Sequence, residues 1–347
     1  MSVVPDAVIL PDATLTIKGI LLLMKKWIIA GIVSLVFLAI AGLAFDYVDH
    51  QRVKQEAIEL GQEIFLGEES AFVIDSFSGT GLSDNERTFV LEYGLGSSVF
   101  GLETLASKLE PYGRVIRYER ARNWYDPHGH HPEDLDRHAE ILNQLLLQLK
   151  VEGRVVLVGF SMGGHYIRSY ANRHPEKVEA LIVIDSGSSE DRLAPLEAKN
   201  RWVFDYAEVL EKNSYLARFG LIRMGLYWAS LLSGESVSLR ALLENSADHL
   251  AAQNVAGQGF FRLVADIDWT LNTHIPVYYV ASRTDLDSDH KESLRSVYKF
   301  IEKHRIGDVK VAKQVSHLDL IEEGYVETLV KDVMAFIKKA EGLPSAE

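Results

Sequence analysis

Apolar and polar positions follow two different periods along most of the chain. Short β-branched apolar runs predict buried strands, and stretches with an apolar residue at every third or fourth position predict helices between them. The strand-like runs lie at residues 88–94, 114–120, 154–160, 180–186, 277–282 and 309–315, and the helical stretches at 135–149, 162–173, 290–304 and 320–339. This pattern predicts an α/β domain with helices on both faces of a mostly parallel sheet, and residues 72–77 add an antiparallel strand at its start.

The alternation is interrupted once, between residues 187 and 273. This interval holds several helical patterns, many aromatic side chains and no run typical of a strand. Open α/β sheets bind ligands at the carboxyl ends of their strands, so an insertion here predicts a helical lid over that edge. The sheet domain is then expected to comprise residues 70–186 and 274–342.

The N-terminal region predicts a membrane segment. From Trp27 to Phe45 nineteen consecutive residues carry no charge, and two lysines precede them. A helix of that length rises about 28 Å, close to the thickness of the hydrocarbon core of a bilayer. We expect a cytoplasmic segment at 1–26, a transmembrane signal anchor at 27–48 and a solvated stalk at 49–69, with the catalytic part outside the cytoplasm.

A cleaved signal peptide is the alternative for the same segment. Translation from Met24 would give a basic start, an apolar stretch and a small-residue cleavage signal at Ala39-Ile40-Ala41. The mature protein would then be secreted. Both interpretations place the rest of the chain outside the cytoplasm.

Composition narrows the classes of partner. With 347 residues, of which 47% are hydrophobic, the chain is long enough to bury a sizeable core. A net charge of -13 argues against binding to nucleic-acid phosphates, which requires a basic face. The chain has no cysteine, which excludes disulfides, thiolate metal sites and a cysteine nucleophile.

The pentapeptide at 159–163, Gly-Phe-Ser-Met-Gly, is the strongest chemical signal. An apolar strand precedes it and a helical stretch follows, which is the context of a nucleophile elbow that presents a serine hydroxyl on a sharp turn. Ser161 is therefore the expected nucleophile. A serine hydroxyl needs a base within hydrogen-bonding reach and an acid that orients the base.

The sequence offers one well-placed base and three acids. His317 follows the last predicted strand and precedes the last helix, which puts it at the same edge of the sheet as the elbow. Asp285 is the preferred acid because it lies on the first turn after the strand at 277–282; Asp287 is the second candidate, and Asp185, at the end of the strand before it, is the third. Each gives the order serine, acid, histidine.

Two backbone N–H groups are expected to stabilise the oxyanion that forms during acyl transfer. One belongs to Met162, the residue after the nucleophile. The other is expected in the glycine-rich bend at 94–98, where Leu95 is the candidate.

Residues from about 88 to 339 resemble the α/β-hydrolase superfamily, in particular its bacterial esterase and aminopeptidase-like members. The resemblance rests on Leu-Val-Gly-Phe-Ser-Met-Gly-Gly at 157–164, Tyr-Ala at 170–171, His-Pro-Glu-Lys-Val at 174–178 and Leu-Ile-Val-Ile-Asp-Ser at 181–186. It implies an α/β-hydrolase fold with an eight-stranded, mostly parallel sheet and a helical lid. It also implies Ser161 as nucleophile, Asp285 as acid and His317 as base.

A cluster of possible metal ligands precedes the helical stretch at 135–149. It consists of Asp126, His128, His130, His131, Asp134 and His138. Such side chains can bind zinc. A serine mechanism needs no metal, so we expect a solvated loop here and no cofactor.

The sequence thus predicts an exported or anchored serine hydrolase that cleaves a carboxylic ester or related acyl bond, with an apolar group on a small-molecule substrate. One alternative is an aminopeptidase-like amide hydrolase, for which Glu208, Glu211, Glu235 and Glu244 of the lid are candidates to hold a free amine. The other is a non-catalytic, membrane-anchored binding protein, because this fold does not guarantee turnover.

Overall fold

Eight strands form one sheet in the computed structural model, which describes residues 13–67, 69–77, 87–120, 125, 134–186, 201–266, 274–283 and 288–342. The strands are β1 (Gln62–Leu66), β2 (Glu69–Asp75), β3 (Arg87–Glu92), β4 (Gly113–Tyr118), β5 (Val155–Phe160), β6 (Val178–Ile184), β7 (Val277–Arg283) and β8 (Gly307–Lys313). Their order across the sheet is β1-β2-β4-β3-β5-β6-β7-β8. β1 and β2 pair antiparallel, as do β2 and β4, and the remaining neighbours are parallel. The predicted α/β-hydrolase fold is confirmed.

Helices cover both faces of the sheet. One face packs against α3 (Leu135–Gln148), α4 (Gly163–Arg173) and α10 (Ser288–Ile301), and the other against α2 (Glu103–Leu109) and α11 (Val326–Glu341). In β5, Val155 and Leu157 belong to the first core and Val156 and Val158 to the second, and all four are almost completely buried. A strand that is buried on both faces has to be apolar throughout, which explains the continuous run in the sequence.

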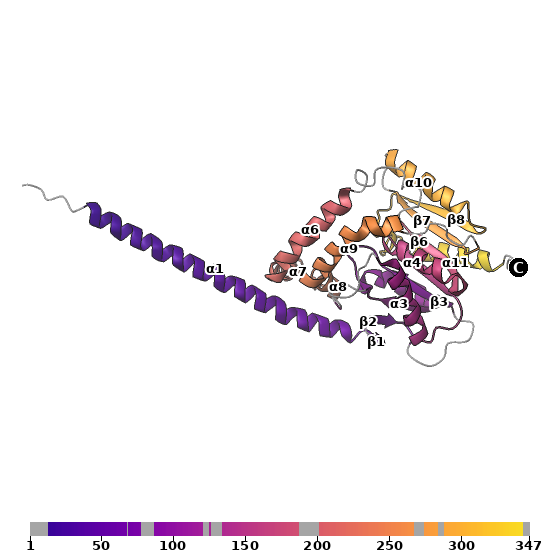
Figure 1. Cartoon of the computed structure of the whole chain (residues 1–347), viewed down its shortest axis with the longest axis horizontal. Helices are drawn as coiled ribbons and strands as arrows, with labels where there is room; N and C mark the ends of the chain where they lie inside the picture. Colours follow the sequence, from indigo (N-terminus) through magenta and orange to yellow (C-terminus); the bar gives the residue numbers. More distant parts are fainter. Residues whose placement is uncertain are drawn as a thin grey trace, which may run out of the picture.

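Residues 201–266 of the expected lid are entirely helical between their short connections. They form α6 (Arg201–Arg218), α7 (Leu221–Ser233), α8 (Leu239–Glu244) and α9 (Ala247–Asp266). α6 packs along α9, with Ala207 against Gly257 and Leu210 in one cluster with Leu250. Figure 1 shows this group of helices between the sheet domain and the N-terminal helix.

The N-terminal helix α1 runs without a break from Ala13 to Ile58. Figure 1 shows it leaving the domain as a long rod. From Gly19 onward it contains a window with a mean hydropathy of 2.7 that is almost wholly exposed, and it is long and apolar enough to cross a membrane. A signal sequence shares this length and composition.

The segment that we expected to form a solvated stalk packs onto the domain instead. Val53 and Ala57 of α1 are fully buried in a cluster with Phe72 of β2, Phe100 and Leu243. Residues 62–66 then form the edge strand β1. The sequence pattern concealed this packing because the two apolar positions, four residues apart, are surrounded by charged ones.

This packing predicts that the C-terminal part of α1 contributes to stability. A Val53→Asp substitution places an unpaired carboxylate in an apolar cluster, so we expect it to lower the free energy of unfolding by about 3 kcal/mol or more. Gln55→Asp adds the same charge on the exposed side of the same helix turn and should change it by less than about 0.5 kcal/mol. Thermal unfolding in detergent checks both; equal effects would contradict the packing.

Candidate active site

Ser161 occupies a strained turn between β5 and α4. Its φ angle is +53°, in the left-handed region that a residue with a side chain rarely adopts. A Cβ atom at Gly159 would lie 2.7 Å from the backbone of Gly163, and one at Gly163 would lie 2.2 Å from the carbonyl oxygen of Glu92. Neighbouring backbone leaves no room for a side chain at either position, so both have to be glycine. The strand, turn and helix expected around this motif are all present.

His317 lies beside this turn, on the loop between β8 and the short 3-10 helix η5 (Leu318–Leu320). Its ring stacks on Phe160, the residue before Ser161, with centroids 4.5 Å apart. Its Nδ1 atom lies 2.7 Å from Oδ2 of Asp185. A carboxylate at Nδ1 leaves Nε2 as the nitrogen able to accept a proton from a hydroxyl group.

Asp185 follows β6 directly and is itself in the left-handed region, with a φ angle of +48°. Ser282 of β7 donates two hydrogen bonds to its carboxylate: the backbone N–H to Oδ1 at 3.0 Å and the hydroxyl to Oδ2. Burial raises the pKa of Asp185, but the hydrogen bonds from His317 and Ser282 outweigh it and hold the pKa below its usual value of 3.8. A lowered native pKa means that this stabilisation is present above about pH 4 and is lost as the pH falls through the native value.

The acid paired with the histidine is thus the third of the three candidates in the sequence. Asp285 and Asp287 lie outside the described residues, so the expected partnership of Asp285 with His317 stays a prediction. Ranking by distance from the end of the strand at 277–282 favoured Asp285. The signal for Asp185 in the sequence is its position at the end of a predicted strand; that strand, β6, pairs with β5, which ends directly before Ser161.

The expected oxyanion loop passes directly beside the serine. A Cβ atom at Gly94 would lie 3.0 Å from Cβ of Ser161. Leu95 and Met162 belong to one small apolar cluster. The cluster also contains Tyr166 of α4 and Ala256 of the lid helix α9. The structure therefore brings together the two residues expected to donate N–H groups and places the lid over them.

The buried side chain of Arg120 holds this loop in place through hydrogen bonds to its carbonyl oxygens. Arg120 donates hydrogen bonds to the carbonyl oxygens of Tyr93 at 2.7 Å and Gly94 at 3.3 Å. Its guanidinium group also forms an ion pair with Glu92 at 3.0 Å and lies over the rings of Tyr93 and Tyr166, 3.8 and 4.7 Å from their centroids. Because each peptide group is planar, hydrogen bonds that hold these carbonyl oxygens also hold the orientation of the N–H groups in the same peptide planes. The sequence pattern did not indicate this role for Arg120.

Glu92 is the completely buried centre of the same network. It accepts hydrogen bonds from His138 at 2.8 Å and from Tyr118, in addition to the ion pair with Arg120. Burial raises the pKa of Glu92, and the charges and hydrogen bonds of His138, Arg120 and Tyr118 lower it below the usual value. The carboxylate is thus held in its charged form.

Two residues of the possible metal cluster have other roles in the structure. His138 bonds with Glu92 in the core, and the Asp134 side chain caps α3 by accepting from the backbone N–H of Arg137 at 2.9 Å. Asp126, His128, His130 and His131 lie outside the described residues. Among the described residues, no group of three or more possible ligands is arranged to hold a metal ion.

The lid also contacts the oxyanion loop through polar groups. Glu244 accepts hydrogen bonds from the Ser97 hydroxyl at 3.0 Å and from the N–H of Ser98 at 2.9 Å. Gln253 accepts from the N–H of Gly96 at 2.8 Å. Arg240 bridges Glu244 to Glu322, 3.1 Å from each, near the loop that carries His317. The lid is thus tied to both loops that flank the serine.

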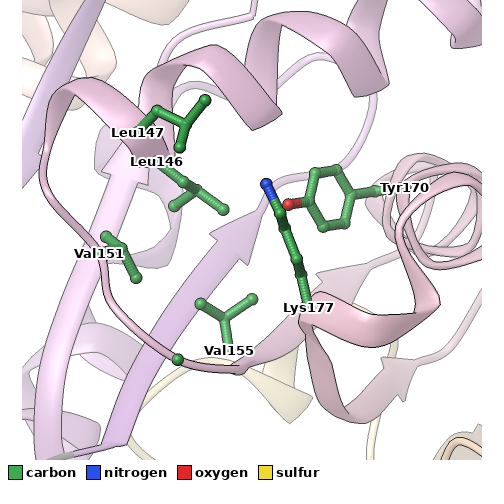
Figure 2. Close-up of a pocket in the computed structure, with 7 residues that line it drawn as sticks. Leu146, Leu147, Val151, Val155, Tyr170 and Lys177 are labelled. Carbon is green, nitrogen blue, oxygen red and sulfur yellow. The ribbon is translucent and has the colours of Figure 1, made fainter.

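A pocket of about 160 Å³ lies at the other end of the strands. It is lined by Val155 at the start of β5 and by Tyr170 and Lys177, with other residues shown in Figure 2. Ser161 follows the end of the same strand. This pocket is therefore separate from the serine and histidine.

The chain belongs to the alpha/beta hydrolase fold family, whose model matches residues 112–299. This range contains Ser161 and Asp185. A curated relative, the "Putative non-heme haloperoxidase" of Mycobacterium phage D29, is 31% identical over 106 residues, which span 29% of this chain and 37% of the relative. The match thus covers little more than a third of that protein's length.

Solved structures show the same fold over almost their whole length. A "putative lipase" from Acinetobacter baumannii AYE is 16% identical with a TM-score of 0.58, and the match covers 84% of this chain and 96% of that one. A membrane phospholipase A described as a bacterial virulence factor is 20% identical with a TM-score of 0.55, covering 92% of this chain and 100% of that one. Identities this low show the fold alone.

The close approach at Gly163 gives a direct test of the elbow geometry. Gly163→Ala forces the new methyl group against the Glu92 carbonyl, so we expect a loss of about 1–3 kcal/mol of stability. Gly225→Ala, in the interior of α7 with open space around its Cβ position, is the matched control and should be neutral or stabilising. Urea unfolding in detergent distinguishes the two; an undisturbed Gly163→Ala variant would contradict the geometry.

The Arg120 network predicts a second, larger effect. Arg120→Met leaves the Glu92 carboxylate buried without its cation, which should cost about 3–5 kcal/mol. Adding Glu92→Gln should recover part of that loss, because the two residues are directly coupled. Arg218→Met, at an exposed position of α6, is the control and should change stability little. If the changes in the free energy of unfolding caused by the two substitutions simply add in the double variant, as measured by urea unfolding, the pair is not coupled.

Proposed function

We propose that this chain is a membrane-anchored serine hydrolase that cleaves a carboxylic ester or a related acyl bond. The observation that carries the proposal is the pairing of His317 with Asp185 while the imidazole ring stacks on Phe160, directly before Ser161. A base oriented by a carboxylate beside a serine on a nucleophile elbow is the arrangement that acyl transfer requires. In this proposal Asp185 takes the role of the acid.

The proposed reaction has two stages. Nε2 of His317 accepts the proton of the Ser161 hydroxyl as its oxygen attacks the carbonyl carbon, and the carboxylate of Asp185 stabilises the imidazolium. The backbone N–H groups of Met162 and Leu95 stabilise the negative oxygen of the tetrahedral intermediate. His317 then protonates the leaving alcohol. A water molecule cleaves the acyl-enzyme by the same steps in reverse order.

An anchored, extracytoplasmic enzyme with an apolar acyl substrate fits the rest of the chain best. α1 continues without a break from its apolar segment into residues that pack against the domain. The likeness in fold to a membrane phospholipase A and to a protein described as a lipase, which are 20% and 16% identical to this chain, supports an apolar acyl group.

The aminopeptidase alternative has less support. Of the acidic lid residues considered for binding an amine, Glu244 is engaged by Ser97, Ser98 and Arg240, and Glu208 forms an exposed ion pair with Lys212 on the outside of α6. A non-catalytic binding protein would not need the strained serine or the oriented histidine. The site therefore favours an ester substrate.

Covalent labelling tests the nucleophile. Ser161→Ala removes the hydroxyl while leaving the backbone turn occupied by a small residue, so labelling by a fluorophosphonate probe should disappear and the unfolding temperature should stay within a few degrees. Persistent labelling of this variant would contradict the assignment.

Parallel substitution of the acids tests which one assists His317. Asp185→Asn should lower kcat for a p-nitrophenyl ester by about 10⁴-fold, as loss of the acid does in serine proteases. Asp285→Asn should change it by less than about tenfold. The reverse ranking would assign the role to Asp285, and turnover unaffected by either variant would contradict a triad.

A further inference from the structure

One face of lid helix α7 is apolar and exposed. Its members are Leu221, Met224, Trp228, Leu231 and Leu232, whose exposed fractions range from 42% to 73%. At 100° per residue these positions fall within an arc of about 100° on the helix surface. Exposed apolar stripes of this kind mark contact with a membrane or another protein.

The α6–α7 corner and Tyr227, which borders the apolar face of α7, contact α1 at the end of its apolar segment. A Cβ atom at Gly42 of α1 would lie 2.2 Å from the carbonyl oxygen of Phe219, and one at Gly220 would lie 2.9 Å from the carbonyl oxygen of Gly42. Phe45 packs edge-on against Tyr227 with ring centroids 6.3 Å apart. The corner between α6 and α7 therefore lies at the same level along α1 as the last turn of the uncharged segment.

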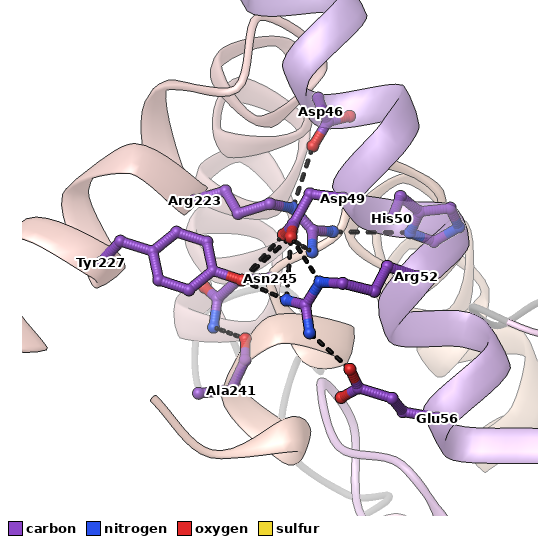
Figure 3. A network of polar contacts seen from close by, with 9 residues as sticks. All are labelled: Asp46, Asp49, His50, Arg52, Glu56, Arg223, Tyr227, Ala241 and Asn245. Carbon is purple, nitrogen blue, oxygen red and sulfur yellow. Dashed lines mark hydrogen bonds and ion pairs between the residues drawn. The ribbon is translucent and has the colours of Figure 1, made fainter. Parts of the chain in front are cut away.

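Charged and polar groups hold the two helices together just beyond that level (Figure 3). Arg223 of α7 is almost completely buried between Asp46 and Asp49 of α1, at 3.2 and 2.9 Å. Tyr227 contacts Asp49 at 3.0 Å and also Arg52, whose guanidinium donates to the tyrosine oxygen at 2.6 Å. Separating α7 from α1 would expose or unpair these groups, so the two helices move together.

The Asp49 carboxylate is held in its charged form within this cluster. Burial raises the pKa of Asp49, but hydrogen bonds from Arg52, Arg223 and Tyr227 outweigh it and lower the pKa below the usual value. A row of fixed charges directly after an apolar segment belongs at the level of the lipid head groups. This row sets the depth of α7 relative to a bilayer that α1 spans.

We propose that the apolar face of α7 and the α6–α7 corner are seated in the outer surface of the bilayer that α1 spans, so that the lid draws an acyl substrate dissolved in lipid. The proposal rests on the proposed anchor and hydrolase activity. Lipid is the occupant because the α6–α7 corner meets the apolar segment of α1 itself. Figure 1 shows α7 on the side of the domain turned toward the N-terminal part of α1.

The amphipathic character of α7 agrees with this position. One face of α7 carries leucine, methionine and tryptophan, and its arginine and tyrosine lie at the level of the head groups. Helices that lie in a membrane interface have this composition. Its place in the lid connects the membrane to the active site. The next helix, α8, contributes Leu243 to the cluster around Val53 of α1 and Glu244 to the oxyanion loop.

Depth-dependent quenching tests the proposal in the full-length chain. The chain has no cysteine, so Trp228→Cys provides a single labelling site. A bimane label there is compared in phosphatidylcholine and phosphatidylglycerol vesicles with labels at Ile32→Cys, within the apolar segment, and at Lys331→Cys, exposed on α11. Nitroxide-bearing lipids should quench positions 228 and 32, and aqueous iodide should quench position 331.

Each other result overturns the proposal in its own way. A label at 228 that behaves like the one at 331 places α7 in water. Protection of position 228 from both quenchers, together with concentration-dependent dimers, assigns the face to a second copy. Failure of lipid quenching at position 32 removes the anchor itself.

Kinetics separate this proposal from the hydrolase proposal. Leu231→Glu combined with Leu232→Glu should lower the hydrolysis of a long-chain ester embedded in vesicles by about tenfold or more. Turnover of a soluble short-chain ester should be unchanged, because neither residue belongs to the catalytic group. If the double variant hydrolyses the vesicle substrate as fast as the wild-type protein does, the membrane role of α7 is overturned. If the wild-type protein hydrolyses neither ester, the proposed hydrolase activity is overturned, and so is substrate supply through the lid. The quenching result would still report the depth of α7.

Discussion

The hydrogen bond from the N–H of Ser161 to the carbonyl oxygen of Ile184, 2.8 Å long, is the interaction around which the site is arranged. It extends the pairing of β5 and β6 by one residue, just as the chain turns into α4. The N–H of Asp185 makes the same kind of bond to Val280, at 2.7 Å. Two successive strands thus end in left-handed residues whose backbones are fixed by the next strand, and their side chains emerge at one edge of the sheet.

This constraint explains why the surrounding residues are so closely specified. The turn at Ser161 brings Gly163 against the Glu92 carbonyl, so β3 and the loop after it have to pass directly beside the serine. Glu92 in turn needs Arg120 as a buried partner, and Arg120 fixes the carbonyls of that loop. A strained serine is maintained because rigid strands and a buried ion pair determine its surroundings.

The sheet, the elbow and the helical lid could be predicted from the sequence because each depends on local pattern. Apolar runs such as the one at 154–160 identify buried strands, and the glycines at 159 and 163 identify the turn. The sequence pattern does not by itself single out the partner of His317, since three aspartates follow strands that are predicted to end at the same edge. Which carboxylate meets the histidine depends on the twist and spacing of β6, β7 and β8, which a linear pattern does not contain. The contact of α1 with α7 was equally hidden, because Arg223 and Asp49 are read as solvent-exposed charges until the fold brings them together.

We propose that Ser161 and the His317–Asp185 pair form one catalytic group at this edge of the sheet. A crystal structure of the protein after reaction with an alkyl fluorophosphonate tests it most directly. We expect phosphorus bonded to the Ser161 oxygen, a phosphonyl oxygen within hydrogen-bonding distance of the N–H groups of Leu95 and Met162, and His317 still paired with Asp185. An adduct on another residue, or His317 paired with Asp285 in that structure, would contradict it.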